Sequence, residues 1–128
     1  MEKYFLYING KFTEASDKGT FISYDPSNGE AIAEISSATL DDTTEAIKSA
    51  RRAFDSNVWY GKSREERSRI IKQIVDKINE NKERLTELEI KDSGSTFKKA
   101  TEDIYLSARN LNSFAKMALT DFDEVSEI

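Results

Sequence analysis

The sequence contains no cysteine and no histidine among its 128 residues. These two absences exclude disulfide frameworks, thiolate metal sites, cysteine nucleophiles and histidine-based acid–base chemistry, including a Ser-His-Asp triad. Glycine is also scarce, with five residues at positions 10, 19, 29, 61 and 94. Neither G-x-G-x-x-G nor G-x-x-x-x-G-K-[ST] occurs, so no glycine-rich phosphate loop is present. The residues alone therefore indicate an α+β protein without an internal active site.

Positive charge is in deficit, with 19 Lys and Arg against 24 Asp and Glu and a net charge of −5. A phosphate-binding surface needs an excess of Lys and Arg, so we expect no nucleic-acid partner. Four of the five net negative charges lie at the end of the chain, in Asp121, Asp123, Glu124 and Glu127. We expect residues 119–128 to form a flexible acidic tail. No apolar run approaches the roughly 20 residues of a membrane span, and no signal-peptide core follows Met1, which predicts a soluble cytoplasmic protein without a membrane partner.

The first third of the chain predicts two β-hairpins. Asn9-Gly10 separates an apolar run from Tyr4 to Asn9 from a short run at 11–13, and Asn-Gly is the strongest short hairpin signal. A second pair of strands, Phe21–Tyr24 and 31–35, flanks a turn that contains Pro26. We expect these strands to have no parallel partner within the chain.

The remainder predicts four amphipathic helices. Thr39 is an expected N-cap of the first, whose apolar stripe is Leu40, Thr43, Ile47, Ala50 and Phe54. Ser63 and Glu66 form a capping box ahead of a helix at about 63–80. Asn81 is an expected cap for a shorter helix that ends at Gly94, and a last helix follows at about 97–118. We interpret Trp59, in the connector, as a core anchor rather than a stacking platform.

Two carboxylates are the main candidates for chemistry. Glu89 and Asp92 lie three residues apart, so they share a helix face and could serve as an acid–base pair or bind a hard cation. The alternative is an ordinary solvated helix end, and the spacing favours that alternative.

The order of several motifs resembles the N-terminal segment of the aldehyde dehydrogenase superfamily. The resemblance covers residues 5 to about 118 without a gap and rests on the following segments: Tyr7 to Phe12 for an "INGxW/F" hairpin, Tyr24 to Ile35 for an "NPaTGevia" segment, Ala46 to Trp59 for an "Av.aAr.Af…W" helix, Ser63 to Ile71 for "s..eRs.iL", and Leu85 to Gly94 for "la.le..dsGKp". Ser95-Thr96 replaces the family's usual Lys and Pro or small residue after this glycine. Family members also run to several hundred residues.

The resemblance implies the outer part of a cofactor-binding domain for residues 1–118, within an aldehyde dehydrogenase-like α/β fold. The family oxidises an aldehyde to a carboxylic acid through a cysteine thiohemiacetal, with NAD or NADP as the cofactor. In the family the catalytic groups and cofactor loops lie downstream of this segment. We therefore expect an N-terminal fragment that lacks the catalytic part, is inactive alone, binds no cofactor alone and requires the remainder of the dehydrogenase or a partner subunit.

One binding site is implied by the same resemblance. Some family members bind a monovalent cation through backbone carbonyls before the "NP" turn and a carboxylate before the "sG" stop. The matching residues here are Ser23, Tyr24 and Asp92, and their oxygen donors suit a hard cation. The alternative is that Asp92 only caps or pairs locally.

Two further functions remain open: a non-catalytic binding or subunit module that docks through exposed helix faces, and an unrelated small helical protein. The fragment hypothesis predicts uncovered apolar residues on the Tyr4–Phe12 hairpin and along Phe97, Ile104 and Leu111, together with self-association of the isolated chain.

Overall fold

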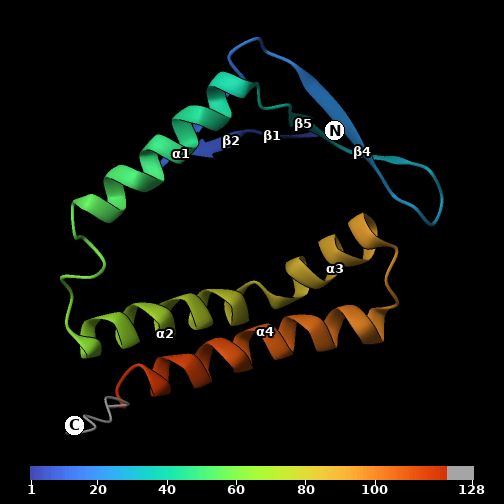
Figure 1. Ribbon diagram of the computed structural model, residues 1–128. Helices are drawn as coiled ribbons and strands as arrows, with labels where there is room; N and C mark the ends of the chain where they lie inside the picture. The colour runs from blue at the N-terminus through green and yellow to red at the C-terminus, as the bar shows by residue number, and fades with distance from the viewer. Residues whose placement is uncertain (121–128) are drawn as a thin grey trace, which may run out of the picture.

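The computed structural model describes residues 1–120 as five short strands followed by four helices (Figure 1). The strands are β1 (Glu2–Tyr4), β2 (Leu6–Ile8), β3 (Lys11–Thr13), β4 (Thr20–Tyr24) and β5 (Ala31–Ser36). The helices are α1 (Leu40–Asp55), α2 (Arg64–Glu80), α3 (Lys82–Ser93) and α4 (Phe97–Met117). The predicted order of strands and helices is thus confirmed. Residues 121–128 of the predicted tail at 119–128, including its four acidic residues, lie outside the described residues.

Both predicted hairpins are present. β2 pairs antiparallel with β3 across Asn9 and Gly10, whose φ angles of 53° and 76° are the left-handed values that a type I′ turn requires. β4 pairs antiparallel with β5. The expectation that no strand has a parallel partner is wrong, because β1 pairs in parallel with β5 to give the sheet order β1-β5-β4. Local periodicity could not reveal this pairing, since it joins Glu2 to Ala33 across the whole hairpin region.

The helix ends are set by local hydrogen bonds. Thr39 and Ser63 each form the reciprocal capping box, with Asp42 and Glu66 as their partners. Asn81 makes no side-chain cap bond, so the predicted cap is wrong, and its Nδ2 instead donates to the Lys77 carbonyl. Gly94 ends α3 in the left-handed conformation, with its N–H donating to Ile90.

The core is small and built from small residues. The buried residues of α2, α3 and α4 are Ser68, Thr86, Ala100, Ala108 and Ala115, which permit close approach of the three helices. Among the described residues, no large side chain is fully buried. Trp59 is 47% exposed, so its interpretation as a core anchor is wrong. The total accessible surface is 9967 Å², against roughly 6,900 Å² expected for a compact protein of 14.6 kDa.

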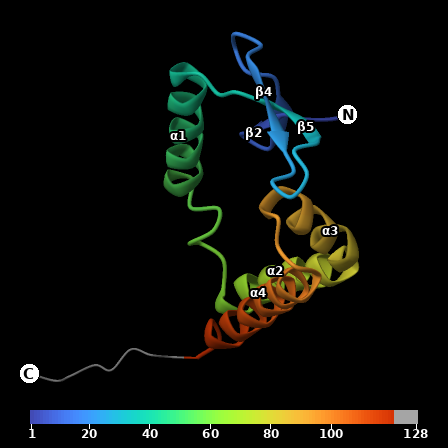
Figure 2. The same cartoon turned by 90° about the vertical axis from the view of Figure 1, so that its right-hand side faces the viewer.

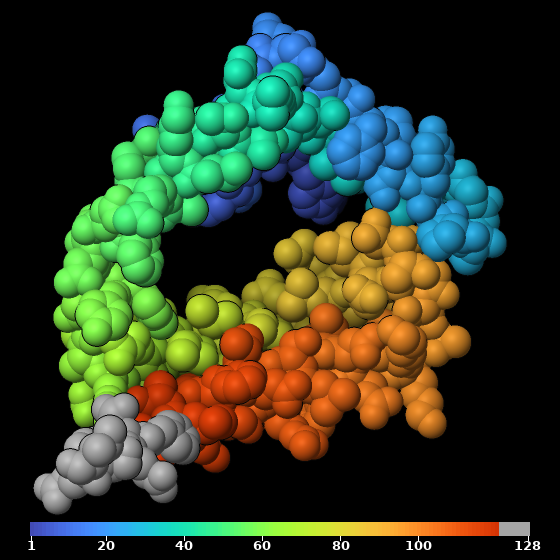
Figure 3. All heavy atoms as spheres, in the orientation of Figure 1, coloured from blue at the N-terminus to red at the C-terminus, as the bar shows by residue number. Residues whose placement is uncertain are grey.

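The elements surround an open space rather than a packed centre. In the space-filling view an opening separates α1 and the strands from α2 and α3 (Figure 3). The view turned by 90° shows α1 beside the strands and α2, α3 and α4 stacked below them (Figure 2). The chain therefore consists of a strand layer with α1 and a separate helix layer. No helix of residues 1–120 is both long and apolar enough to cross a membrane.

Candidate functional site

Ser23 and Asp92, predicted to lie at one site, meet in the structure. Ser23 is on β4 and Asp92 is in the last turn of α3. The Ser23 Oγ donates a hydrogen bond of 3.0 Å to Oδ1 of Asp92. This contact lies where the strand layer touches the helix layer, so the two residues come from both sides of the seam between them.

Tyr24, the third predicted residue, follows Ser23 at the end of β4. It pairs with Ala31, and the strand register shifts between Ser23 and Tyr24. Such an irregularity re-aims the backbone groups beside it. The family resemblance selects the carbonyls of Ser23 and Tyr24. These two residues therefore lie on either side of the one register shift between β4 and β5 within the described residues.

The turn after β4 is fixed by Asp25. Its Oδ1 accepts hydrogen bonds of 2.8 Å from the Ser27 N–H and 2.6 Å from the Ser27 hydroxyl. These two bonds, the hydroxyl first, lower the pKa of the Asp25 carboxyl below its ordinary value. The Asp25 carbonyl also accepts from the Gly29 N–H at 2.7 Å. The turn is therefore held from both the side chain and the backbone, and it presents Pro26 to the end of α3.

Glu89 lies three residues before Asp92 on α3. Its carbonyl accepts a 2.6 Å hydrogen bond from the Ser93 hydroxyl, a local contact at the end of the helix. The Asp92 carboxylate instead reaches across to Ser23. The acid–base pair of Glu89 and Asp92 that the spacing suggested stays a prediction.

The donor atoms at the seam are of the type that a hard monovalent cation prefers. One carboxylate and two neighbouring backbone carbonyls are oxygen ligands, which hard cations prefer. Within residues 1–120, no three His, Cys, Asp or Glu side chains gather to hold a metal ion. The set therefore does not suit zinc or another transition metal. The cation site at Ser23, Tyr24 and Asp92 stays a prediction.

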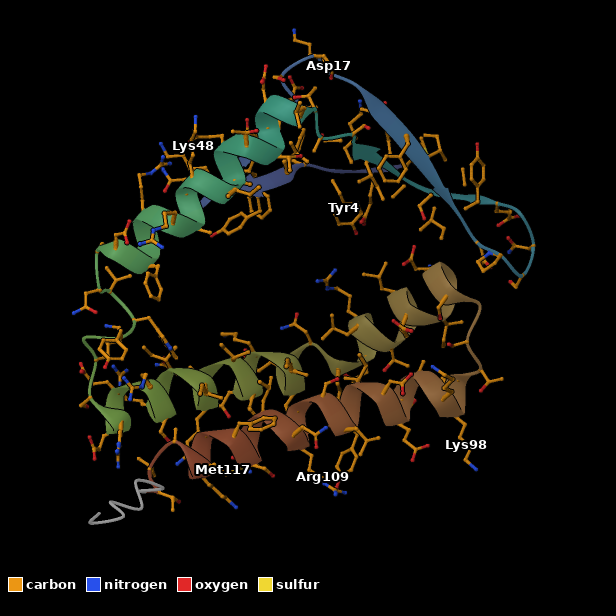
Figure 4. All side chains as sticks on the ribbon, viewed as in Figure 1. Tyr4, Asp17, Lys48, Lys98, Arg109 and Met117 are labelled. Carbon is orange, nitrogen blue, oxygen red and sulfur yellow. The ribbon has the colours of Figure 1, made fainter. Side chains whose placement is uncertain are left out.

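Arg84 and Lys91 were missed by the sequence reasoning, although both lie on α3 opposite the strands. Together with Tyr4 and Ile32 they line a hollow between β1 and α3. The Tyr4 hydroxyl donates a 2.6 Å hydrogen bond to Glu2, which raises the pKa of Tyr4 against the opposing effect of Arg84. Figure 4 shows the Tyr4 side chain extending from the strands toward the helices. The parallel pairing of β1, which places Tyr4 here, carried no local sequence signal.

The N-terminus of α1 does not suit the phosphate of a dinucleotide. The junction of β5 and α1 is the strand-to-helix turn at which a phosphate could meet free N–H groups. Here the carboxylate of Asp42 occupies that position and accepts bonds from the Thr39 N–H at 2.9 Å and the Ser16 N–H at 3.1 Å. Asp41 adds a second negative charge in the same turn. This helix end repels a phosphate, so no step of hydride transfer is assigned to this chain.

The apolar stripe of α1 is uncovered. The half-buried side of α1 consists of Asp42, Ala46 and Ser49; Asp42 accepts a hydrogen bond from Ser16, and Ser49 donates to the Asn9 side chain at 3.4 Å. The stripe on its other side leaves Leu40 82%, Ile47 65% and Phe54 72% exposed. No residue of α1 is buried. A helix that leaves its apolar stripe exposed has a surface suited to another protein segment.

The other predicted uncovered residues divide into two groups. Phe97 is 72% exposed, and Tyr7 and Phe12 of the first hairpin are exposed as expected. Ile104 and Leu111 are half-buried, so that expectation is wrong. Both lie on α4, which packs on α2 and α3. The spacing identified the α1 stripe, but the sequence did not show which face of this helix would be covered.

Comparison with known proteins gives one consistent result. The sequence model of the aldehyde dehydrogenase family matches residues 12–127. The chain is 35% identical over 114 residues to the mitochondrial aldehyde dehydrogenase family 2 member B4 of Arabidopsis thaliana, which covers 88% of this chain. It is 36% identical over 124 residues to human 2-aminomuconic semialdehyde dehydrogenase, which covers 95% of this chain.

A solved structure agrees. Betaine aldehyde dehydrogenase of Staphylococcus aureus, crystallised with NAD+, superposes with a TM-score of 0.89 at 35% identity over 95% of this chain. The chain spans 21% and 24% of the length of the two relatives and 25% of that structure. It therefore corresponds to about a quarter of each protein it matches.

Proposed function

Because the chain belongs to the aldehyde dehydrogenase family, we propose that it serves as the N-terminal segment of an NAD(P)-dependent aldehyde dehydrogenase and is inactive by itself. The complete enzyme oxidises an aldehyde to a carboxylic acid through a cysteine thiohemiacetal. The observation that carries the proposal is the match over almost the whole chain to about a quarter of each relative. No cysteine is available in this sequence to supply the nucleophile.

The role of the segment is structural. It forms the outer part of the cofactor-binding domain and packs its uncovered apolar surfaces against the remainder of the enzyme. The α1 stripe and the exposed ring pair Tyr7–Phe12, whose centroids lie 5.0 Å apart, supply that surface. Burial of apolar surface contributes about 25 cal/mol per Å² removed from water, so these residues favour association.

The seam supplies the second part of the role. A monovalent cation at Ser23, Tyr24 and Asp92 would be held by oxygen donors from β4 and α3. Proximity of Ser23 to Asp92 supports this site. Further ligands come from the remainder of the dehydrogenase.

The exposed α1 stripe also favours one alternative, a non-catalytic module that docks on a partner subunit through this helix. The two proposals differ in the partner. An N-terminal segment binds the catalytic part of an aldehyde dehydrogenase. A docking module binds an unrelated subunit and does not bind the catalytic part.

A binding experiment separates them. The chain, carrying an affinity tag, is co-expressed with the Staphylococcus aureus betaine aldehyde dehydrogenase from which the matching segment has been deleted. The proposal expects the two to co-purify in equal amounts and expects Ile47→Asp in this chain to abolish the complex. Lys48→Asp, a neighbouring charge change off the stripe, is the matched control and should leave the complex intact. Failure of the two parts to associate would favour the docking module.

A further inference from the structure

The described chain packs as two separate parts. In one part, β4 and β1 pair with β5, and α1 lies against β2. In the other part, α4 packs against both α2 and α3. The buried residues follow the same division, with Ala15, Ala33 and Ser36 in the strand part and the small residues of α2, α3 and α4 in the helix part. Each part therefore has its own interior.

The parts are joined along the chain by residues 56–63. This connector has no helix or strand, and its residues are exposed except for Lys62. Asn57 sits at a φ of 63°, a left-handed value that is unusual for a residue other than glycine. Arg67 of α2 donates to the carbonyls of Tyr60 and Lys62, which holds the second half of the connector to the helix part. The Ser56 N–H donates to the Arg52 carbonyl and so holds the start of the connector to α1. A hinge therefore falls between the residues held to α1 and those held to α2.

The parts also meet in space at the seam between β4 and α3. Two small contacts lie there: the hydrogen bond from Ser23 to Asp92, and the close approach of Pro26 to Gly94. On the strand side of α3 the packing is open, because hollows that share Ile32 and Lys91 flank the seam. A close-packed interface would leave no such voids. The seam is therefore a narrow contact rather than a core.

We propose that the strand part and the helix part open and close about residues 56–58, and that the Ser23–Asp92 hydrogen bond is the latch that favours the closed form. The latch is exposed, so it stabilises the closed form only modestly. Removal of one such hydrogen bond shifts a two-state population by about fivefold. The opening and closing concern this chain alone; only their consequence for docking rests on the function proposed above.

The closed form has the shape found in the complete relative. At a TM-score of 0.89 over 95% of the chain, both parts superpose at the same time. A latch that holds this shape before a partner arrives reduces the ordering needed on association. The latch therefore preorganises the chain for docking.

The absence of cysteine makes a direct distance measurement simple, because introduced thiols are the only ones to label. Nitroxide labels are attached through Lys48→Cys on α1 and Arg109→Cys on α4, which lie in the strand part and the helix part (Figure 4). The proposal expects a dominant short distance by double electron–electron resonance. Ser23→Ala or Asp92→Ala should raise the ratio of a longer, broader population to the short one by about fivefold.

Three controls identify the cause. A second label pair, Lys72→Cys with Arg109→Cys, lies within the helix part and should stay narrow in every variant, which separates opening from unfolding. Ser107→Ala removes a hydroxyl that donates within α4 and should not change the Lys48–Arg109 distribution. Asp92→Asn retains an oxygen that accepts from Ser23 and should preserve the short distance. A Lys48–Arg109 distance distribution that neither Ser23→Ala nor Asp92→Ala changes would overturn the proposal. A Lys72–Arg109 distance distribution that broadens in the same variants would overturn it as well, because the helix part would then be unfolding.

Discussion

Gly94 ends α3 directly against the ring of Pro26, so a Cβ atom at position 94 would lie 2.9 Å from Cγ of Pro26. Gly94 also has a φ of 68°, where any side chain strains the backbone. Two independent physical reasons thus require glycine at this position: the left-handed conformation of the helix end and the approach of the β4–β5 turn. The same residue both ends a helix and sets the spacing of the seam.

Gly94→Ala should lower the free energy of unfolding by more than Gly10→Ala does. Gly10 has a similar φ of 76° but nothing within 4 Å of its added Cβ, so it measures backbone strain alone. That strain costs about 1 kcal/mol, and the clash with Pro26 adds to it at position 94. Urea denaturation of both variants checks the difference. Equal decreases in the free energy of unfolding would show that the Pro26 ring moves aside at no energetic cost.

Stability should fall at acid pH in part through Asp42. Its hydrogen bonds from the Thr39 and Ser16 N–H groups lower its pKa in the folded state. The group therefore stabilises the fold above the unfolded pKa of about 3.9, and this contribution disappears as pH falls through the lower folded pKa. Asp42→Asn should make the fall in urea midpoint below about pH 5 shallower. Asp41→Asn, in the same helical turn, is the matched control. If both variants reduced the pH dependence of the urea midpoint equally, the role given to Asp42 would be contradicted.

The α1 stripe should dominate the binding of a hydrophobic dye to the isolated chain. Ile47→Ser should reduce dye fluorescence and self-association on size-exclusion chromatography. The thermal midpoint should barely change, because the Ile47 side chain is 65% exposed. Ala46→Ser, on the half-buried face of the same helix, should leave the dye signal unchanged. An undiminished signal in Ile47→Ser would place the uncovered surface elsewhere.

The sequence predicted those parts of the fold that depend on neighbours along the chain. Asn9-Gly10, Thr39, Ser63 and Gly94 each act through bonds within a few residues, so their turn and cap geometry followed from residue type. The parallel pairing of β1 with β5 did not, because it depends on a contact across about thirty residues of chain. Asn81 is an exception to the capping prediction, because its side-chain amide donates to the Lys77 carbonyl instead of capping the N-terminus of α3.

The site was predictable only through the family resemblance. Residue type and spacing paired Asp92 with Glu89, whereas the structure pairs Asp92 with Ser23, 69 positions away. The resemblance selected Ser23, Tyr24 and Asp92 together because it carries information about which distant segments meet. The exposed α1 stripe shows the converse: its spacing was evident, but a different side of the helix, with Asp42, Ala46 and Ser49, is the half-buried one.

The most direct test of the central claim is aldehyde-dependent reduction of NAD+ by two separate chains. This chain and the Staphylococcus aureus enzyme lacking the matching segment are purified apart and then mixed with betaine aldehyde and NAD+, and NADH is followed by its absorbance. The account predicts no turnover from either part alone and turnover from the mixture that rises with this chain and is lost with Ile47→Asp. Turnover by this chain alone would contradict the account, and so would an inactive mixture in which the two parts have formed a stable complex.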